Sequence, residues 1–305
     1  MQNKIQKNKI KEQSNGTIKS MLLDQLNQLV WSDDILCLAL HTKKHSRLQK
    51  SKNVDCHYIV LKEDQLTNFL EKLKKYNCES TKKRFQAAVH HDNHWYMLDI
   101  EIKHNQLSCV YIDSIRNTDQ PEKIQQLIEQ FYGKNYFFYD IYLNALSLQR
   151  DYNNCSRFTL NNIFTCQKAI SLHDELAWQK KENQNNFLIS FKTMPISLLN
   201  ILRPLQDINF IKYIPESILK APIKAPKEYD DNSKQTFTLE KLYEQNIKPH
   251  ENDLGLKIWN MFILDKREKY TKKISTFINQ TSESELNDII TNARENIFFE
   301  LSMNK

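Results

Sequence analysis

Three short apolar runs follow one another closely in the first half of the chain, and they constrain the fold more than any other feature. The runs are Arg84–His90, His94–Lys103 and Leu107–Asp113, and only a few polar residues separate each from the next. Runs of this length joined by short polar turns are typical of an antiparallel β-meander. The sequence therefore predicts three adjacent strands in this order.

Further elements are predicted on both sides of the meander. Val54–Leu61 and Tyr136–Tyr142 have the apolar character of strands. Asp64–Tyr76, Pro121–Tyr132 and Cys155–Ile170 carry apolar residues at helical spacing. The order strand, helix, three strands, helix, strand, loop, helix predicts an α+β fold with a mixed central sheet flanked by helices.

The length of 305 residues suffices for one large domain or two modest ones. Residues 1–20 are rich in Lys, Gln and Asn, so we expect a flexible tail there. We expect the core in residues 21–180 and a helical C-terminal region, packed on that core, in residues 181–305. The helices expected in this region span Leu239–Gln245, roughly 254–277 and Glu283–Leu301.

Composition excludes several classes of function. The chain contains 3 isolated glycines, which excludes the glycine-rich phosphate loops of dinucleotide- and nucleotide-binding proteins. No Cys/His spacing matches a zinc site, so we expect no metal. No apolar stretch approaches the about 18 residues of a membrane span, and no Sec-type signal pattern is present. A net charge of +6 suits an anionic ligand but does not indicate nucleic-acid binding.

Four polar residues stand where they can form one active site. His94 opens the second strand of the meander, Asp113 closes the third, Gln149 lies in a polar loop, and Cys155 begins the next helix. A helix N-terminus stabilises a thiolate, a histidine can take the thiol proton, and an acid can orient the imidazole. Gln149 and the Cys155 backbone N–H can hold an oxyanion. The pattern predicts nucleophilic catalysis by Cys155.

Asp99 is a rival candidate for the acid. Side chains alternate along a strand, so we expect Asp99 on the face opposite His94. Asp113 is therefore the preferred partner of His94.

The order and spacing of these four residues resemble the CE clan of cysteine proteases and acyltransferases, which includes the YopJ/AvrA/HopZ effectors and the Ulp/SENP proteases. The segments HWYMLDIEIK and YFFYDIYLNALSLQRDYNNCSRFTL are similar to the YopJ segments around the catalytic His and Cys. LDKREKYTKKI resembles the C-terminal KR helix of that family. The resemblance implies a papain-like core followed by a C-terminal regulatory region.

This resemblance also implies a function. It implies an effector that transfers an acetyl group from acetyl-CoA to Ser, Thr or Lys of host signalling proteins through an acyl-enzyme on Cys155. It implies inositol hexakisphosphate as an activator, with Lys266 and Arg267 matching the KR pair. It further implies secretion by a bacterial type III or type IV-like system, without a Sec signal, into the host cytoplasm.

The chain departs from the YopJ pattern at two places. Ser156 replaces the usual glycine after the nucleophile, and we expect it to form the first turn of a helix, where serine is well suited. Asn200 and Ile201 stand where the family has the Lys and His of its KHTQ element.

Two alternative functions stay open. His94-Trp95 and Asp113-Ser114 resemble the HW and DS pairs of the Ulp branch, which favours a ubiquitin or ubiquitin-like protease (a deubiquitinase) that uses the same triad. Its partners would be ubiquitin or ubiquitin-like conjugates. The third possibility is a non-catalytic module that binds a host protein.

Overall fold

The structure describes most of the chain, with gaps between the described segments. The computed structural model describes residues 17–49, 57–75, 82–115, 119–141, 147–149, 151, 153–179, 186–191, 193–223, 236–250 and 257–303. A flexible tail was expected at residues 1–20. Residues 1–16 lie outside the described residues. Residues 18–20 belong to the first turn of helix α2.

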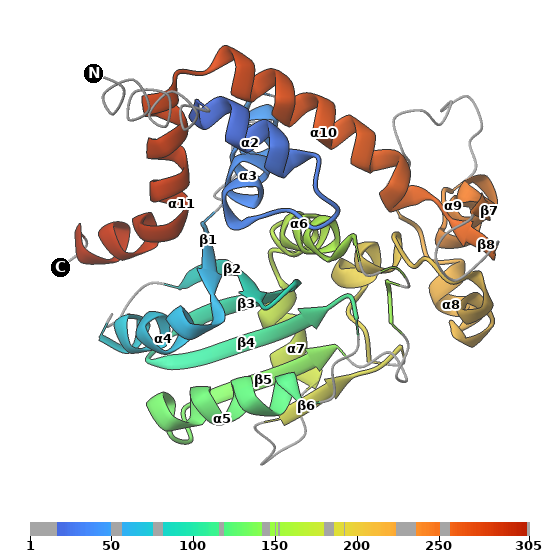
Figure 1. Ribbon diagram of the computed structural model, residues 1–305. Coiled ribbons are helices and arrows are strands. Elements are labelled where there is room, and N and C mark those ends of the chain that lie inside the picture. The colour runs from blue at the N-terminus through green and yellow to red at the C-terminus, as the bar shows by residue number, and fades with distance from the viewer. Residues whose placement is uncertain are drawn as a thin grey trace, which may run out of the picture.

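A six-stranded mixed sheet lies at the centre of the molecule (Figure 1). Its strands stand side by side in chain order. β2, β3 and β4 pair antiparallel, whereas β1, β5 and β6 each pair parallel to the neighbouring strand. The predicted α+β fold with a mixed sheet is therefore confirmed. The strands are β1 (Tyr58–Lys62), β2 (Lys83–His91), β3 (His94–Lys103), β4 (Gln106–Asp113), β5 (Tyr136–Ile141) and β6 (Asn186–Ile189).

Helices α4 (Leu66–Lys75) and α5 (Gln120–Tyr132) cover one face of the sheet (Figure 1). The even-numbered residues Tyr96 and Leu98 of β3 lie in one hydrophobic cluster with the apolar side chains of these two helices. Helix α5 ends at Gly133, whose φ of 58° is a left-handed conformation that suits glycine.

Helix α6 (Cys155–Cys166) covers the other face and contacts β2 and β3. All of its residues are buried, because α3 (Asp33–Leu48), α10 (Phe262–Gln280) and other segments enclose it from the side away from the sheet (Figure 1). The N-terminal helices α2 (Ile18–Leu26) and α3 both pack against α10, and α3 also packs against α11 (Glu283–Met303). The two ends of the described chain therefore share one core with the sheet.

The remaining elements connect these layers or lie at one end of the sheet. The short 3₁₀ helices are η1 (Glu63–Gln65), η2 (Ile196–Leu202) and η3 (Ile208–Tyr213). The other elements are α7 (Leu172–Gln179), α8 (Glu216–Leu219), α9 (Leu239–Asn246), and the hairpin of β7 (Ile247–His250) and β8 (Lys257–Asn260).

One predicted helix begins later than expected. The sequence pattern predicted a start near residue 254, but Lys257–Asn260 is strand β8 and α10 begins at Phe262. The side chain of Asn260 accepts a hydrogen bond from the Phe262 backbone N–H at 3.1 Å, which separates strand from helix. Helices α3 and α7 and strand β6 were not predicted. In α3 the residues from Ile35 to Leu40 are all buried, so they show no amphipathic period.

Neither a membrane-spanning helix nor a metal cluster is found in the part of the chain that the structure describes. No helix there is both long and apolar enough to cross a bilayer. No group of three or more His, Cys, Asp or Glu side chains in that part could hold a metal ion.

Candidate active site

Cys155 is the first residue of α6, and its side chain is fully buried. The positive end of the α6 dipole therefore lies at the sulfur, which stabilises a thiolate there. The thiol donates to the backbone carbonyl of Asn93 at 3.8 Å. Because Asn93 precedes the first residue of β3, this contact brings the start of α6 to the start of the strand that carries His94.

His94 and Asp113 form a close pair at the same end of the sheet. Nε2 of His94 lies 2.6 Å from Oδ1 of Asp113. Tyr96 pairs with Asp113 across β3 and β4, so His94 is a diagonal neighbour of Asp113. Asp113 also accepts from the Tyr111 hydroxyl at 3.0 Å and from the Ile115 backbone N–H at 2.9 Å. These donors fix the carboxylate in one orientation.

The charge state of His94 depends on both neighbours. Burial of the imidazole favours its neutral form, but the hydrogen bond to Asp113 and the interaction with the Cys155 thiol outweigh burial and raise the pKa of His94 to about 10. His94 is therefore protonated at neutral pH. Because Nε2 is held by Asp113, Nδ1 is the ring nitrogen left for the thiol. The arrangement suits a thiolate–imidazolium pair.

Asp99, the rival acid, lies in a different network. Its carboxylate accepts from Nε and Nη2 of Arg84 at 2.8 Å and 2.5 Å, and Nε2 of His173 lies 3.3 Å from it. Arg84 also donates to the carbonyls of Cys166 and Ala169, so this network holds the C-terminal end of α6. Cys155 is at the opposite end of that helix. Although the Asp99 side chain is buried, Arg84 and His173 hold its pKa well below the usual range.

Gln149, the expected oxyanion donor, is buried in the loop before α6. Its amide oxygen accepts from the Ser114 hydroxyl at 2.8 Å, next to Asp113 in the chain. Its amide nitrogen donates to the backbone carbonyl of Asp151. The same nitrogen also donates to Oδ1 of Asp151 at 3.3 Å, so both donor contacts of this amide go to Asp151.

Asp151 organises the loop that precedes Cys155. The sequence pattern did not single out this residue. Its Oδ1 accepts from the backbone N–H groups of Asn153 and Asn154 at 3.0 Å and 2.9 Å, and its Oδ2 accepts from the Asn154 amide at 2.8 Å. Aspartate commonly accepts in this way from residues two and three positions on. In the sequence, the short polar run around Asp151 was the signal that could have predicted these loop hydrogen bonds.

Arg157, the second residue after Cys155, is also a residue that sequence reasoning missed. It is fully buried, and its guanidinium lies over the Trp31 ring at 4.5 Å. Nη1 donates to the carbonyls of Leu29 and Asn153, both at 2.8 Å, whereas Nε and Nη2 have no partner among the described residues. Burial and the nearby charge of Arg267 lower the pKa of Arg157 to about 9. A buried cation therefore lies in α6 two residues after Cys155.

Ser156 adopts the first turn of α6 without a positive φ. The backbone at this position therefore does not need glycine. Its hydroxyl is buried and has no hydrogen-bond partner within the described part of the chain.

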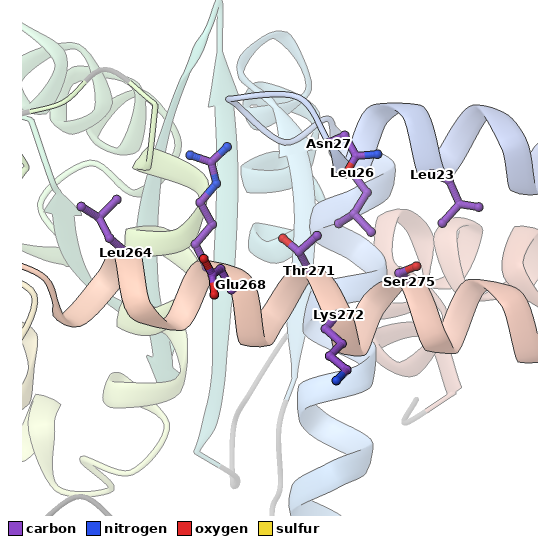
Figure 2. A pocket seen from close by; sticks show the side chains of 9 residues that line it. Leu23, Leu26, Asn27, Leu264, Glu268, Thr271, Lys272 and Ser275 are labelled. Carbon is purple, nitrogen blue, oxygen red and sulfur yellow. The ribbon is translucent and has the colours of Figure 1, made fainter. Parts of the chain in front are cut away.

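The two residues expected to bind a cofactor, Lys266 and Arg267, point to different surroundings. The Lys266 ammonium lies 3.7 Å from the centre of the Phe262 ring. Arg267 lines a groove of about 640 Å³ between α2 and α10. In Figure 2, Leu26 of α2 lies across this groove from Thr271 and Ser275 of α10. Two further charged residues, Glu268 and Lys272, belong to its lining.

The region aligned with the KHTQ element forms part of η2. Ile201 there is fully buried, and the Asn200 side-chain oxygen is buried without a partner among the described residues. Neither position offers a cation to a ligand.

The chain matches one protein family and shares its fold with solved structures. The model of the YopJ serine/threonine acetyltransferases matches residues 17–280, which is most of the chain. This chain belongs to the YopJ serine/threonine acetyltransferase family. The match spans the sheet, α6 and α10, so the predicted resemblance to YopJ is confirmed. A search of curated proteins found no match.

Solved structures of two YopJ-family effectors share the fold. HopZ1a, solved in complex with IP6, aligns with a TM-score of 0.55 at 10% identity, over 90% of this chain and 96% of its own. AvrA delL154, solved with IP6 and CoA, aligns with a TM-score of 0.52 at 13% identity, over 77% of this chain and 87% of its own. A desumoylating protease aligns with a TM-score of 0.37 at 12% identity, over 92% of this chain and 91% of its own.

Proposed function

We propose that this chain is an effector acetyltransferase in which Cys155 accepts an acetyl group from acetyl-CoA and passes it to Ser, Thr or Lys of a host protein. Membership of the YopJ family supports acetyl transfer as the reaction. The observation that carries the assignment to these residues is the approach of His94 to both Asp113 and the Cys155 thiol.

In the first step, the Cys155 sulfur attacks the carbonyl carbon of the acetyl thioester. A C–S bond forms to Cys155, the bond to the coenzyme sulfur breaks, and the His94 imidazolium protonates the departing thiolate. The raised pKa of His94 keeps the imidazole protonated, so it carries the proton that the departing coenzyme thiolate takes up. Asp113 holds the imidazolium in place.

In the second step, the hydroxyl or amine of the acceptor attacks the acyl-enzyme. Neutral His94 takes the acceptor proton, the C–S bond to Cys155 breaks, and the thiolate returns beside the imidazolium. Asp113 again orients the ring, so the same nitrogen serves both steps.

The negatively charged oxygen of each tetrahedral intermediate would lie at the N-terminus of α6. The Cys155 backbone N–H is one donor to it, and the Gln149 amide would be the other once its 3.3 Å contact with Oδ1 of Asp151 opens. The bond to the Asp151 carbonyl would keep the amide in place while that contact opens.

The groove between α2 and α10 has the character of an anion site. Arg267 and Lys272 line it, with Glu268 as the acidic member of the lining. Burial and the charge of Arg267 both lower the pKa of Arg157, and an anion bound near Arg267 would offset the repulsion between the two cations. We propose that inositol hexakisphosphate binds there through Arg267, and that Lys266 contributes from the same helix by turning away from the Phe262 ring. The bound polyanion would neutralise these cations and hold α10 against α2.

Family membership supports a proposal for the biological setting. We propose that the acceptors are host signalling proteins and that a bacterial type III or type IV-like system delivers the chain to the host cytoplasm.

A direct test uses the full chain with radiolabelled acetyl-CoA. We expect autoacetylation that increases when inositol hexakisphosphate is added and that is absent from Cys155→Ala. The matched control is Cys37→Ala, because Cys37 is a buried thiol of α3 away from the start of α6. Acetylation that persists in Cys155→Ala would contradict the proposal.

One sequence feature, the HW and DS pairs, favours the protease alternative. Trp95 of the HW pair is fully buried, stacks on His90 with ring centres 4.3 Å apart, and donates to the Trp31 carbonyl at 3.1 Å. This tryptophan therefore belongs to the core, and its burial explains its presence without a substrate contact. A ubiquitin propargyl probe separates the two functions: labelling of Cys155 by the probe would favour the protease.

A further inference from the structure

Gln206 is a fully buried polar residue between η2 and η3, and the proposed chemistry does not use it. Its backbone N–H donates to the Leu148 carbonyl at 2.9 Å, directly before Gln149. A buried amide side chain is costly to keep unless it is fully hydrogen-bonded. The hydrogen-bond partners of the Gln206 side chain therefore indicate its structural role.

The side chain of Gln206 forms a reciprocal pair with Asp151. Its amide nitrogen donates to Oδ2 of Asp151 at 2.5 Å, and its amide oxygen accepts from the Asp151 backbone N–H at 3.2 Å. The Asp151 carboxylate in turn holds the backbone N–H groups of Asn153 and Asn154. Asn154 directly precedes Cys155, so this pair sets the geometry of the chain entering α6.

The backbone of Gln206 is tied to the start of α10. Its carbonyl accepts from the Asn260 backbone N–H at 3.0 Å. The Asn260 side chain, which is also fully buried, donates to the carbonyls of Arg203 and Leu205 at 2.8 Å and 2.9 Å and accepts from the Phe262 N–H. Asn260 therefore fixes both the residues beside Gln206 and the first turn of α10.

We infer that Gln206 is a positioning residue that couples the start of α10 to the loop before Cys155. Every link from Phe262 through Asn260, Gln206 and Asp151 to Asn154 is a hydrogen bond. A displacement at the start of α10 changes the loop because the side chains of Asn260 and Gln206 are fully buried and have no solvent to replace their partners. The inference rests on the proposed function only where Cys155 is taken as the nucleophile.

Amide hydrogen exchange of the full chain tests this coupling without any catalytic assay. In Gln206→Leu we expect exchange at Asn153 and Asn154 and at Phe262 to accelerate by about tenfold or more. In Asn260→Asp, which keeps the acceptor for Phe262 but loses the two amide donations, we expect exchange at Asn153 and Asn154 to accelerate as well. Acceleration confined to α10 in this variant would overturn the inference.

The matched control is Tyr243→Phe. Tyr243 is buried and donates to the Leu202 carbonyl at 2.8 Å, so the variant also removes a buried hydrogen bond to η2 but has no link to the loop. We expect its Asn153 and Asn154 amides to exchange as in the unmodified chain. Equal acceleration in Tyr243→Phe would mean general destabilisation and would overturn a specific role for Gln206.

A reversed pair provides a rescue test in the acetylation assay. Gln206→Glu places a carboxylate against Asp151, and we expect kcat to fall by about 10²-fold with the KM for acetyl-CoA unchanged. Adding Asp151→Asn restores a donor and an acceptor between the two positions, so kcat should recover in part. No recovery would contradict the pairing, whereas absent acetylation in the unmodified chain would overturn the proposed function and leave the exchange result standing.

Discussion

His94 Nε2 lies 2.6 Å from Asp113 Oδ1, and this pair joins the start of β3 to the end of β4. The carboxylate is held by two further donors, Tyr111 and Ile115, so its orientation does not depend on His94 alone. A histidine held in this way has one fixed ring orientation, which is a requirement for moving a proton repeatedly at one atom.

Asp113→Asn should lower both the pKa of His94 and the rate. The pKa of His94, about 10, is above the ordinary value because of Asp113 and Cys155. With the carboxylate removed, burial of the ring dominates and the pKa should fall, which NMR titration of the imidazole measures. We expect kcat to fall by about 10²–10⁴-fold, as for a triad whose acid is replaced by its amide. An unchanged His94 titration would contradict this role of Asp113.

His94 should make stability depend on pH in the alkaline range. Its pKa is raised from 6.5 to about 10 on folding, so its contribution to the free energy of unfolding is fully present below pH 6.5 and is lost as the pH rises through 10. Urea denaturation of the unmodified chain and of His94→Gln should show a stability difference that shrinks over this interval. A constant difference would mean that the pKa of His94 is not raised.

Asp99→Asn should reduce stability more than it affects the chemistry. Asp99 is a fully buried partner of Arg84, and removing one member of a buried ion pair costs about 3–5 kcal/mol. Because the pKa of Asp99 is lowered from 3.8, its contribution is present above pH 3.8 and is lost as the pH falls below that value. The exposed Asp24→Asn is the control. A kcat loss in folded Asp99→Asn equal to that of Asp113→Asn would restore Asp99 as the acid.

Replacement of Arg157 should affect activity more than stability. Methionine has a similar length. Arg157→Met removes a buried cation, two of whose nitrogens have no partner within the described ranges, but it also removes the bonds to Leu29 and Asn153, and these effects oppose each other. We expect alkylation of Cys155 by iodoacetamide at pH 7 to slow by about tenfold because a positive charge favours the thiolate. Arg157→Lys, which keeps the charge, should lie closer to the unmodified chain. Equal effects of Met and Lys would point to lost hydrogen bonds and not to charge.

Charge reversal at Arg267 should weaken polyanion binding to the α2–α10 groove. We expect Arg267→Glu to reduce the affinity for inositol hexakisphosphate by at least about tenfold in calorimetry, which corresponds to about 1.4 kcal/mol, with a smaller effect at high salt. Lys269→Glu makes the same charge change on α10 at an exposed position outside the lining. If both variants lose affinity equally, the groove is not the binding site.

The amino-acid sequence by itself determined the β-meander, the helix that begins at Cys155 and the separation of Asp99 from Asp113. Apolar periodicity, helix starts and the alternation of strand side chains act over a few residues, so they can be read without knowing the rest of the chain. The division of the chain at residues 20 and 180 and the catalytic roles stay predictions.

Only the tertiary structure decided which distant groups meet. The first half of helix α3, where Ile35 to Leu40 are all buried, shows no amphipathic period because this helix packs against α6, α10 and α11. Gln206 meets Asp151 across 55 positions, and Arg157 meets Leu29 across 128. Such contacts arise when packing removes water from polar groups and leaves them only one another as partners, a condition that no short segment of sequence contains.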